Sequence, residues 1–119
     1  MVLYGISNCD TVKRARAWLA QQGTLPEFHD FKKLGVPGAN LDAWMAAVGW
    51  QSLLNRQGTT WRKLDSATQQ GVVDAASARA LMLAQPSVIK RPVVEWPGGA
   101  VSVSVGFDAD RWAGLLQGQ

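Results

Sequence analysis

Cys9, the only cysteine of the chain, stands at a position that favours a reactive thiol. It follows the apolar run Val2–Ile6 and precedes an amphipathic segment at residues 11–22, a pattern that predicts a buried strand followed by a helix. Helix N-termini favour negative charge, and thiol pKa values in comparable places fall to about 3.5–7.5 from about 8.5. Lys13 adds positive charge, whereas Asp10 opposes a thiolate. A buried, inert cysteine is the alternative that these residues leave open.

The dipeptide Arg91-Pro92 is the second feature that bears on a site. Its proline lies between apolar, strand-like segments and cannot donate a hydrogen bond to a central strand ladder. Either a cis peptide bond at the edge of a site or an ordinary trans proline at the start of a strand accounts for it. Arg56 and the other basic residues are predicted to be solvated surface groups, and His29 is predicted to be a structural histidine.

The composition limits the possible classes of function. A chain of 119 residues fits one domain, and a net charge of +3 permits an anionic ligand without requiring one. A single cysteine excludes an internal disulfide and a cysteine-based zinc site. The N-terminus lacks a signal-peptide pattern, and no apolar run is long enough to cross a membrane. We therefore expect a cytoplasmic protein with no metal site, no membrane partner and no direct nucleic-acid partner.

Hydrophobic periodicity predicts an α/β chain. The predicted strands cover residues 2–6, 25–31, 88–89, 92–94 and 101–105. The predicted helices cover residues 11–22, 41–48, 52–55, 60–64 and 74–84, and Asp108 is expected to cap a last helix. A hairpin turn is expected at Trp96–Ala100. This order predicts a thioredoxin-like plan in which the first two strands are parallel and helices are inserted between the two halves.

Four stretches of the chain carry a resemblance to a known family: Tyr4–Lys13, Leu54–Leu64, Leu83–Pro92 and Val105–Asp108. Together and in this order they resemble the arsenate reductase/Spx family, most of all its YffB-like branch. The resemblance implies an α/β, thioredoxin-like fold with a mixed four-stranded sheet. It also implies one domain, residues 1–119, with an inserted helical subdomain at about residues 38–85.

The resemblance also assigns roles to individual residues. Cys9 matches the family's nucleophile, and Arg91, before Pro92, matches one of three arginines that hold arsenate in the reductases. The first family arginine falls on Asn55, so the neighbouring Arg56 is its candidate replacement. The third has no match, because residues 100–108 contain no arginine. The resemblance also implies that the Arg91-Pro92 bond is cis, because this proline borders the thiol site in family members. We also expect Asn8 and Lys13 to contribute to binding beside the thiol.

The function that the resemblance implies is a thiol-dependent oxidoreductase, glutathione-linked, with Cys9 forming a mixed disulfide. No bound cofactor is expected; the partners are glutathione or another small thiol, with a glutaredoxin as a further candidate. A non-catalytic, Spx-like module that contacts RNA polymerase or another protein is the alternative. It is weakened because Val12 stands where Spx proteins carry a second cysteine. Arsenate reduction is the weaker alternative, since two of the three arginines are unmatched and Asp10 repels an oxyanion.

Overall fold

The computed structural model describes residues 1–98 and 101–117, and the chain divides into two compact units. The first, named the sheet unit, comprises Met1–Leu34 and Arg91–Gln119. The second, named the helical unit, is Gly35–Lys90. The helical unit therefore extends a few residues beyond both ends of the insertion predicted at residues 38–85, and the grouping of the whole chain into one domain stays a prediction.

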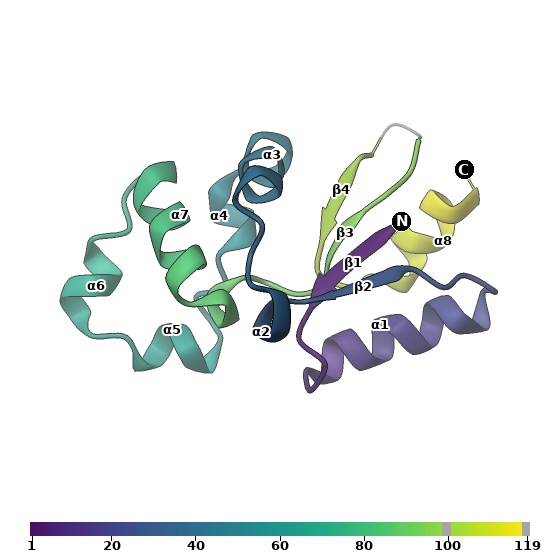
Figure 1. Cartoon of the computed structure of the whole chain (residues 1–119), viewed down its shortest axis with the longest axis horizontal. Coiled ribbons are helices and arrows are strands. Elements are labelled where there is room, and N and C mark those ends of the chain that lie inside the picture. The colour runs from purple at the N-terminus through teal and green to yellow at the C-terminus, as the bar shows by residue number, and fades with distance from the viewer. Residues whose placement is uncertain (99–100, 118–119) are drawn as a thin grey trace. The chain divides into compact units, whose positions relative to one another are not determined.

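A mixed four-stranded sheet forms the centre of the sheet unit (Figure 1). Its strands are β1 (Val2–Gly5), β2 (Glu27–Asp30), β3 (Val93–Glu95) and β4 (Val103–Val105). They stand in the order β2-β1-β3-β4; β1 and β2 are parallel, and the other pairs are antiparallel. Gly5 lies opposite Asp30, and Tyr4 lies opposite Val93. The ends of β1 and β2 and the start of β3 therefore meet at one edge of the sheet.

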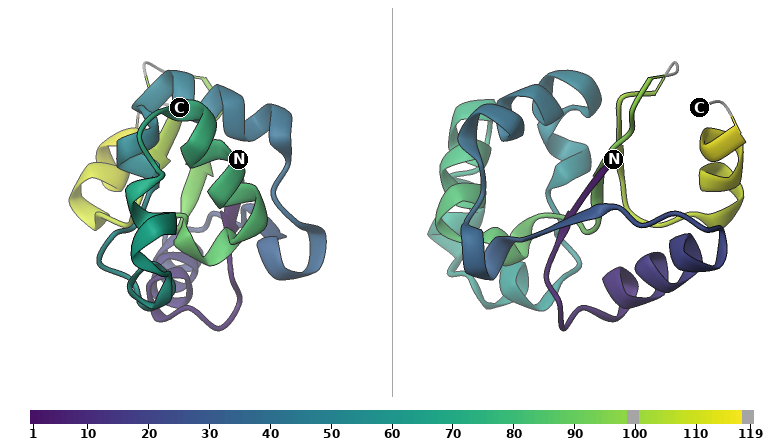
Figure 2. Two further views of the ribbon diagram at one scale, coloured as in Figure 1. Left: turned by 90° about the vertical axis from the view of Figure 1, so that its left-hand side faces the viewer. Right: turned by 45° about the vertical axis from the view of Figure 1, so that its right-hand side comes forward.

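Two helices, α1 (Asp10–Gln21) and α8 (Ala109–Gln117), cover one face of this sheet (Figure 2). Apolar side chains recur along α1 at helical spacing, which gives the helix one face to bury. The carboxylate of Asp108 accepts a hydrogen bond from the N–H of Arg111 at 3.2 Å, which confirms the predicted cap of α8. The buried core between sheet and helices consists of Leu3, Val12, Ala15, Leu19, Val94, Trp96 and Trp112.

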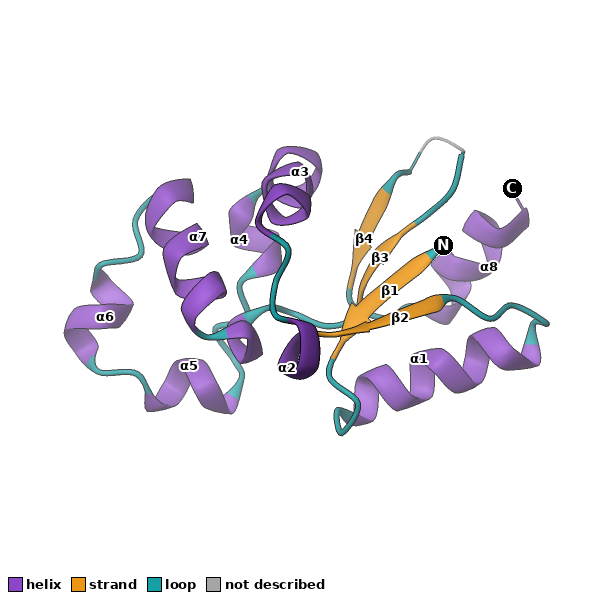
Figure 3. Ribbon diagram, viewed as in Figure 1, coloured by secondary structure: helices purple, strands orange, loops and turns teal. Residues whose placement is uncertain are grey.

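The helical unit contains five α-helices and one 3₁₀ helix among its described residues (Figure 3). They are α3 (Gly38–Val48), α4 (Trp50–Leu53), α5 (Thr59–Lys63), α6 (Ser66–Gln70), α7 (Ala75–Ala84) and η1 (Pro86–Val88). Arg79 and Asp42 form an ion pair between α7 and α3, with Nε and Oδ1 2.6 Å apart. Across the described parts of the chain, no helix has the length and apolar character needed to cross a membrane.

The structure differs from the sequence prediction at three short elements. The strand expected over residues 25–31 ends at Asp30, whose carboxylate accepts the N–H of Lys32 at 2.9 Å and starts the unpredicted turn α2 (Phe31–Leu34). Helix α6 was not predicted either, although Asp65 caps it through the N–H of Thr68 at 2.7 Å. Both elements are only about one turn long, so their sequences are too short to show the apolar periodicity that predicts a helix.

The strand predicted at residues 88–89 is wrong. The chain turns there because the N–H of Val88 donates to the carbonyl of Gln85 at 3.0 Å and forms the 3₁₀ helix. Ile89 makes only an isolated bridge, with Leu54. The two strands of the predicted hairpin do pair, as β3 and β4, while Gly99 and Ala100 of its turn lie outside the described residues.

Candidate active site

Cys9 occupies the junction between β1 and α1, as its position in the sequence predicts. The N–H of Cys9 donates to the carbonyl of Ile6 at 3.2 Å and closes a tight turn after the strand. Cys9 itself is the N-cap of α1, with extended backbone angles of φ −88° and ψ 124°. Its carbonyl accepts the first helical hydrogen bond, from the N–H of Lys13 at 2.9 Å. The thiol therefore lies at the positive end of a twelve-residue helix.

The surroundings of the half-buried thiol favour its ionised form. Burial acts to raise the pKa of Cys9, but four other contributions together outweigh it and lower the pKa below its ordinary value. They are the N–H of Val12, the hydrogen bond and the positive charge of the Arg91 guanidinium, and the N–H of Thr11. The side chain of Cys9 forms no regular capping hydrogen bond with the first turn of α1. The thiolate is therefore stabilised by both the backbone and one cation.

The position of Arg91 follows from the pairing of the sheet. Because Tyr4 of β1 lies opposite Val93 of β3, residues just before Val93 lie beside the turn that follows β1. The carbonyl of Pro92 accepts the N–H of Gly106 at 2.9 Å, which ties this segment to the end of β4. The Arg91-Pro92 peptide bond is cis, the first of the two alternatives that the sequence allows. Backbone pairing thus brings Arg91 and Pro92 to the edge that carries Cys9.

A close contact between strand and helix fixes the first turn of α1. A Cβ atom on Gly5 would lie 2.7 Å from Cγ2 of Val12. Real Cβ atoms do not approach other atoms so closely, so the absence of a side chain at Gly5 lets Val12 lie against the end of β1. Val12 is fully buried in this position. The same residue supplies the N–H that acts on the Cys9 sulfur.

Asn8 and Lys13, the two other residues expected to bind beside the thiol, are both exposed. Asn8 is exposed in the turn between Ile6 and Cys9, and Lys13 is exposed on the first turn of α1. Neither residue is among the groups that change the pKa of Cys9. Asp10 is the first residue of α1 and is exposed as well. The contribution of Asn8 and Lys13 to binding stays a prediction.

Arg56 and Asn55 belong to the helical unit, whereas Cys9, Arg91 and Pro92 belong to the sheet unit. The side-chain oxygen of Asn55 accepts the N–H of Gln57 at 3.1 Å. Arg56 is exposed, and its guanidinium carbon lies 5.9 Å from the ring centre of Trp50 and 5.6 Å from that of Trp61. The role of Arg56 as a replacement for a family arginine therefore stays a prediction.

The sequence predicts that N–H groups at the start of the helix favour the thiolate, and the structure identifies them as the amide groups of Thr11 and Val12. Every residue but proline carries a backbone N–H, so residue type alone gives no signal for them. The only available signal is the general one that a helix begins there. Within residues 1–98 and 101–117, no group of three or more His, Cys, Asp or Glu side chains could hold a metal ion.

A thioredoxin-like fold whose first helix begins at a cysteine defines the class of this protein. The chain belongs to the ArsC family, whose model matches residues 4–115. Its structure is similar to that of a protein named YFFB, with 50% identity, a TM-score of 0.88 and 97% of each chain covered. It is also similar to an arsenate reductase (ArsC) related protein from Brucella melitensis, with 46% identity and a TM-score of 0.71 over 98% of this chain and 93% of that one. An uncharacterized protein from Haemophilus influenzae is 35% identical over 108 residues, 91% of each chain.

Proposed function

We propose that this protein is a thiol-dependent oxidoreductase in which Cys9 is the nucleophile and glutathione is the co-substrate. The observation that supports this proposal most strongly is the contact of the Arg91 guanidinium with a cysteine at the start of α1. A hydrogen bond and a positive charge at the sulfur both stabilise a thiolate, and the thiolate is the form of cysteine that attacks a disulfide.

The proposed reaction has two exchange steps. The Cys9 thiolate attacks the glutathione sulfur of a mixed disulfide, so that a Cys9–glutathione disulfide forms and the substrate leaves as a thiolate that takes up a proton. A second glutathione, as its thiolate, then attacks the glutathione sulfur of that intermediate. The Cys9 thiolate is released, and the two glutathione molecules leave joined as oxidised glutathione. The substrate disulfide is reduced, glutathione is oxidised, and the protein is unchanged at the end of the cycle.

An external thiol is required because the chain has no second cysteine that could resolve the intermediate. In the proposal, Arg91 orients the sulfur and draws the anionic co-substrate to it, and Pro92 forms the adjoining wall. Asn8, Lys13 and Arg56 are the further candidates for contacts with glutathione. A glutaredoxin could take the place of the second glutathione, since it supplies a thiolate for the same exchange.

The direct test is reduction of a peptide–glutathione mixed disulfide in the presence of reduced glutathione, followed by release of the peptide thiol. We expect the native chain to catalyse the reaction and the Cys9→Ser variant to be inactive. Treatment with oxidised glutathione should increase the mass of the native chain by one glutathione and leave Cys9→Ser unmodified. A Cys9 that stays unmodified where free cysteine reacts would contradict the proposal and favour the non-catalytic module that contacts RNA polymerase or another protein.

Arsenate reduction is the second candidate function, because a relative that is 46% identical is described as related to arsenate reductase. We propose that this activity is weak or absent. Only Arg91 matches a family arginine clearly, and a charged hydrogen bond contributes about 1.5–3 kcal/mol. Two missing arginine contacts would therefore weaken arsenate binding by roughly two to four decades. Efficient arsenate turnover by the native chain, assayed beside Cys9→Ser and Arg91→Ala, would reverse the order of the two candidates.

A further inference from the structure

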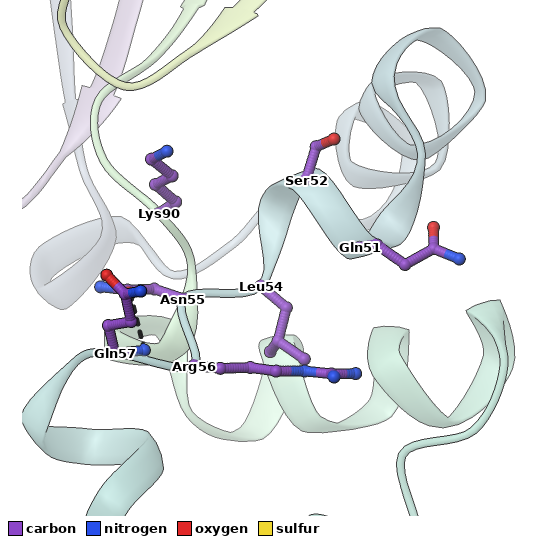
Figure 4. A pocket seen from close by; sticks show the side chains of 7 residues that line it. All are labelled: Gln51, Ser52, Leu54, Asn55, Arg56, Gln57 and Lys90. Atoms are coloured by element: carbon purple, nitrogen blue, oxygen red, sulfur yellow. Dashed lines mark hydrogen bonds between the residues drawn. The ribbon is translucent and has the colours of Figure 1, made fainter.

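Arg91 stands in the chain at the boundary between the two units. The helical unit ends at Lys90, whose N–H donates to the carbonyl of Leu53 at 2.7 Å. Lys90 also lines a pocket of that unit, together with Asn55 and Arg56 (Figure 4). The chain before Arg91 is thus bound into the helical unit, so the backbone contacts that hold Arg91 in the sheet unit come from the residues that follow it.

Pro92 joins the sheet through one backbone group. Proline carries no N–H, so only its carbonyl can take part in a strand ladder. Pro92 is buried, and its carbonyl accepts the N–H of Gly106 at 2.9 Å. The ladder of β3 and β4 includes the pair Val93–Val105, and this hydrogen bond extends the ladder by one position, to the residue next to Arg91.

Gly106 donates this hydrogen bond from a backbone conformation that favours glycine. Its φ angle is 82°, in the left-handed region that residues with a side chain rarely adopt. Another residue at this position would either keep the strained angle or relax it. Because relaxation rotates the backbone, it would turn the N–H of Gly106 away from the carbonyl of Pro92.

Phe107 anchors the bend on its other side. Its ring centre lies 4.8 Å from that of Trp112 and 6.1 Å from that of Trp18. Trp112 belongs to α8 and is buried in the core of the sheet unit, and Trp18 belongs to α1. The bend at Gly106 is therefore held between β4 and two helices, which fixes the direction of its N–H.

We propose that Gly106 is a positioning residue for the candidate active site: its N–H holds the carbonyl of Pro92 and so keeps the Arg91 guanidinium beside Cys9. The proposal rests on the proposed function, in which Arg91 serves the Cys9 nucleophile. Gly106 acts through its neighbours and does not itself contact the sulfur or a substrate.

The rate at which iodoacetamide alkylates Cys9, followed against pH, tests the proposal. Gly106→Ala should shift the rise of the rate to higher pH, because a displaced Arg91 no longer stabilises the thiolate. The shift should not exceed that of Arg91→Gln, and adding Gly106→Ala to Arg91→Gln should cause no further shift, since both changes remove the same contact. Gly106→Asn should keep a profile closer to the native one, because asparagine tolerates a positive φ better than alanine.

Gly23→Ala is the matched control. Gly23 lies just after α1 in the sheet unit and also has a positive φ, 77°, and a Cβ atom there would have no neighbour within 4 Å. It should cost stability for the same backbone reason and leave the alkylation profile native. An unshifted profile in folded Gly106→Ala, an equal shift in Gly23→Ala, or additive shifts in the double variant would each overturn the proposal.

Phe107→Leu is the second variant, for use if Gly106→Ala does not fold. It keeps Gly106 but removes the ring that anchors the bend, so it should also shift the profile to higher pH, and an unshifted profile would overturn the proposal. Alkylation needs neither glutathione nor turnover. Absence of glutathione-dependent activity would therefore refute the proposed function while the positioning of Arg91 by Gly106 is still measured.

Discussion

Arg91 of the sheet unit and Arg56 of the helical unit are held in place by different kinds of contact. In the sheet unit, Arg91 lies next to β3, and its guanidinium lowers the pKa of Cys9 through a hydrogen bond and its charge. In the helical unit, Arg56 is exposed and rests over the rings of Trp50 and Trp61. Strand pairing places the first arginine, whereas side-chain stacking places the second. The first arrangement keeps the guanidinium beside one sulfur atom, whereas the second leaves the guanidinium accessible to a ligand that binds reversibly.

The largest difference in stability is expected between alanine substitutions at Gly5 and at Gly38. Gly5→Ala would force a Cβ against buried Val12, and overpacking of a core costs about 1–3 kcal/mol. Because the N–H of Val12 helps to lower the pKa of Cys9, that pKa should rise in this variant. Gly38→Ala, in the helical unit, would meet only the far end of the Arg79 side chain, which can move aside.

Chemical denaturation and thiol alkylation against pH would measure both effects. Gly38→Ala should unfold like the native chain or at slightly higher denaturant, since alanine is favoured over glycine in a helix. The double variant Gly5→Ala/Val12→Ala removes the colliding methyl groups and should bring the pKa of Cys9 back toward its native value. A Gly5→Ala chain with native stability and native thiol pKa would show that the contact does not fix the first turn of α1.

The next largest effect is expected at Arg91. Removing its charge and hydrogen bond in Arg91→Gln should raise the pKa of Cys9. The thiolate is the reactive form, so the rise of the alkylation rate with pH should shift to higher pH in the variant. Arg62→Gln, which removes an exposed cation from α5, is the matched control and should leave the profile unchanged. An unshifted profile in Arg91→Gln would mean that the backbone alone stabilises the thiolate.

The smallest effect is expected at Asp10. Asp10→Asn removes a like charge next to the thiolate and should lower the pKa of Cys9, by less than Arg91→Gln raises it because the carboxylate is exposed to solvent. Asp110→Asn makes the same change in the first turn of α8, away from any cysteine, and serves as the control. Titration of thiolate absorbance would measure the difference, and a raised pKa in Asp10→Asn would contradict the electrostatic argument.

Sequence reasoning reached further in the sheet unit than in the helical unit. Strand β1, helix α1 and the cap at Asp108 were predicted because each has a strong local signal. The residues around Arg91-Pro92 left both isomers open, because the choice depends on the surrounding sheet; the family resemblance predicted the cis bond, which the structure confirms. Helix α6 and the 3₁₀ helix at Pro86–Val88 escaped prediction, because short elements are set by tertiary contacts rather than by periodicity. The pocket beside Lys90 joins segments about 35 residues apart, which no local pattern relates.

Cys9 lowers the thermal stability of the protein, because cysteine is a poor N-cap residue. N-cap positions strongly prefer Ser, Thr, Asp or Asn, whose oxygens accept hydrogen bonds from the first turn, and the side chain of Cys9 makes no such bond. Replacing its sulfur with a hydroxyl should therefore tighten the start of α1, so that Cys9→Ser unfolds at a higher temperature than the native chain. The gain should be about 0.5–1 kcal/mol, measured by reversible thermal unfolding under reducing conditions. At this position the residue that suits chemistry is the poorer one for folding, so selection for stability alone would remove the thiol.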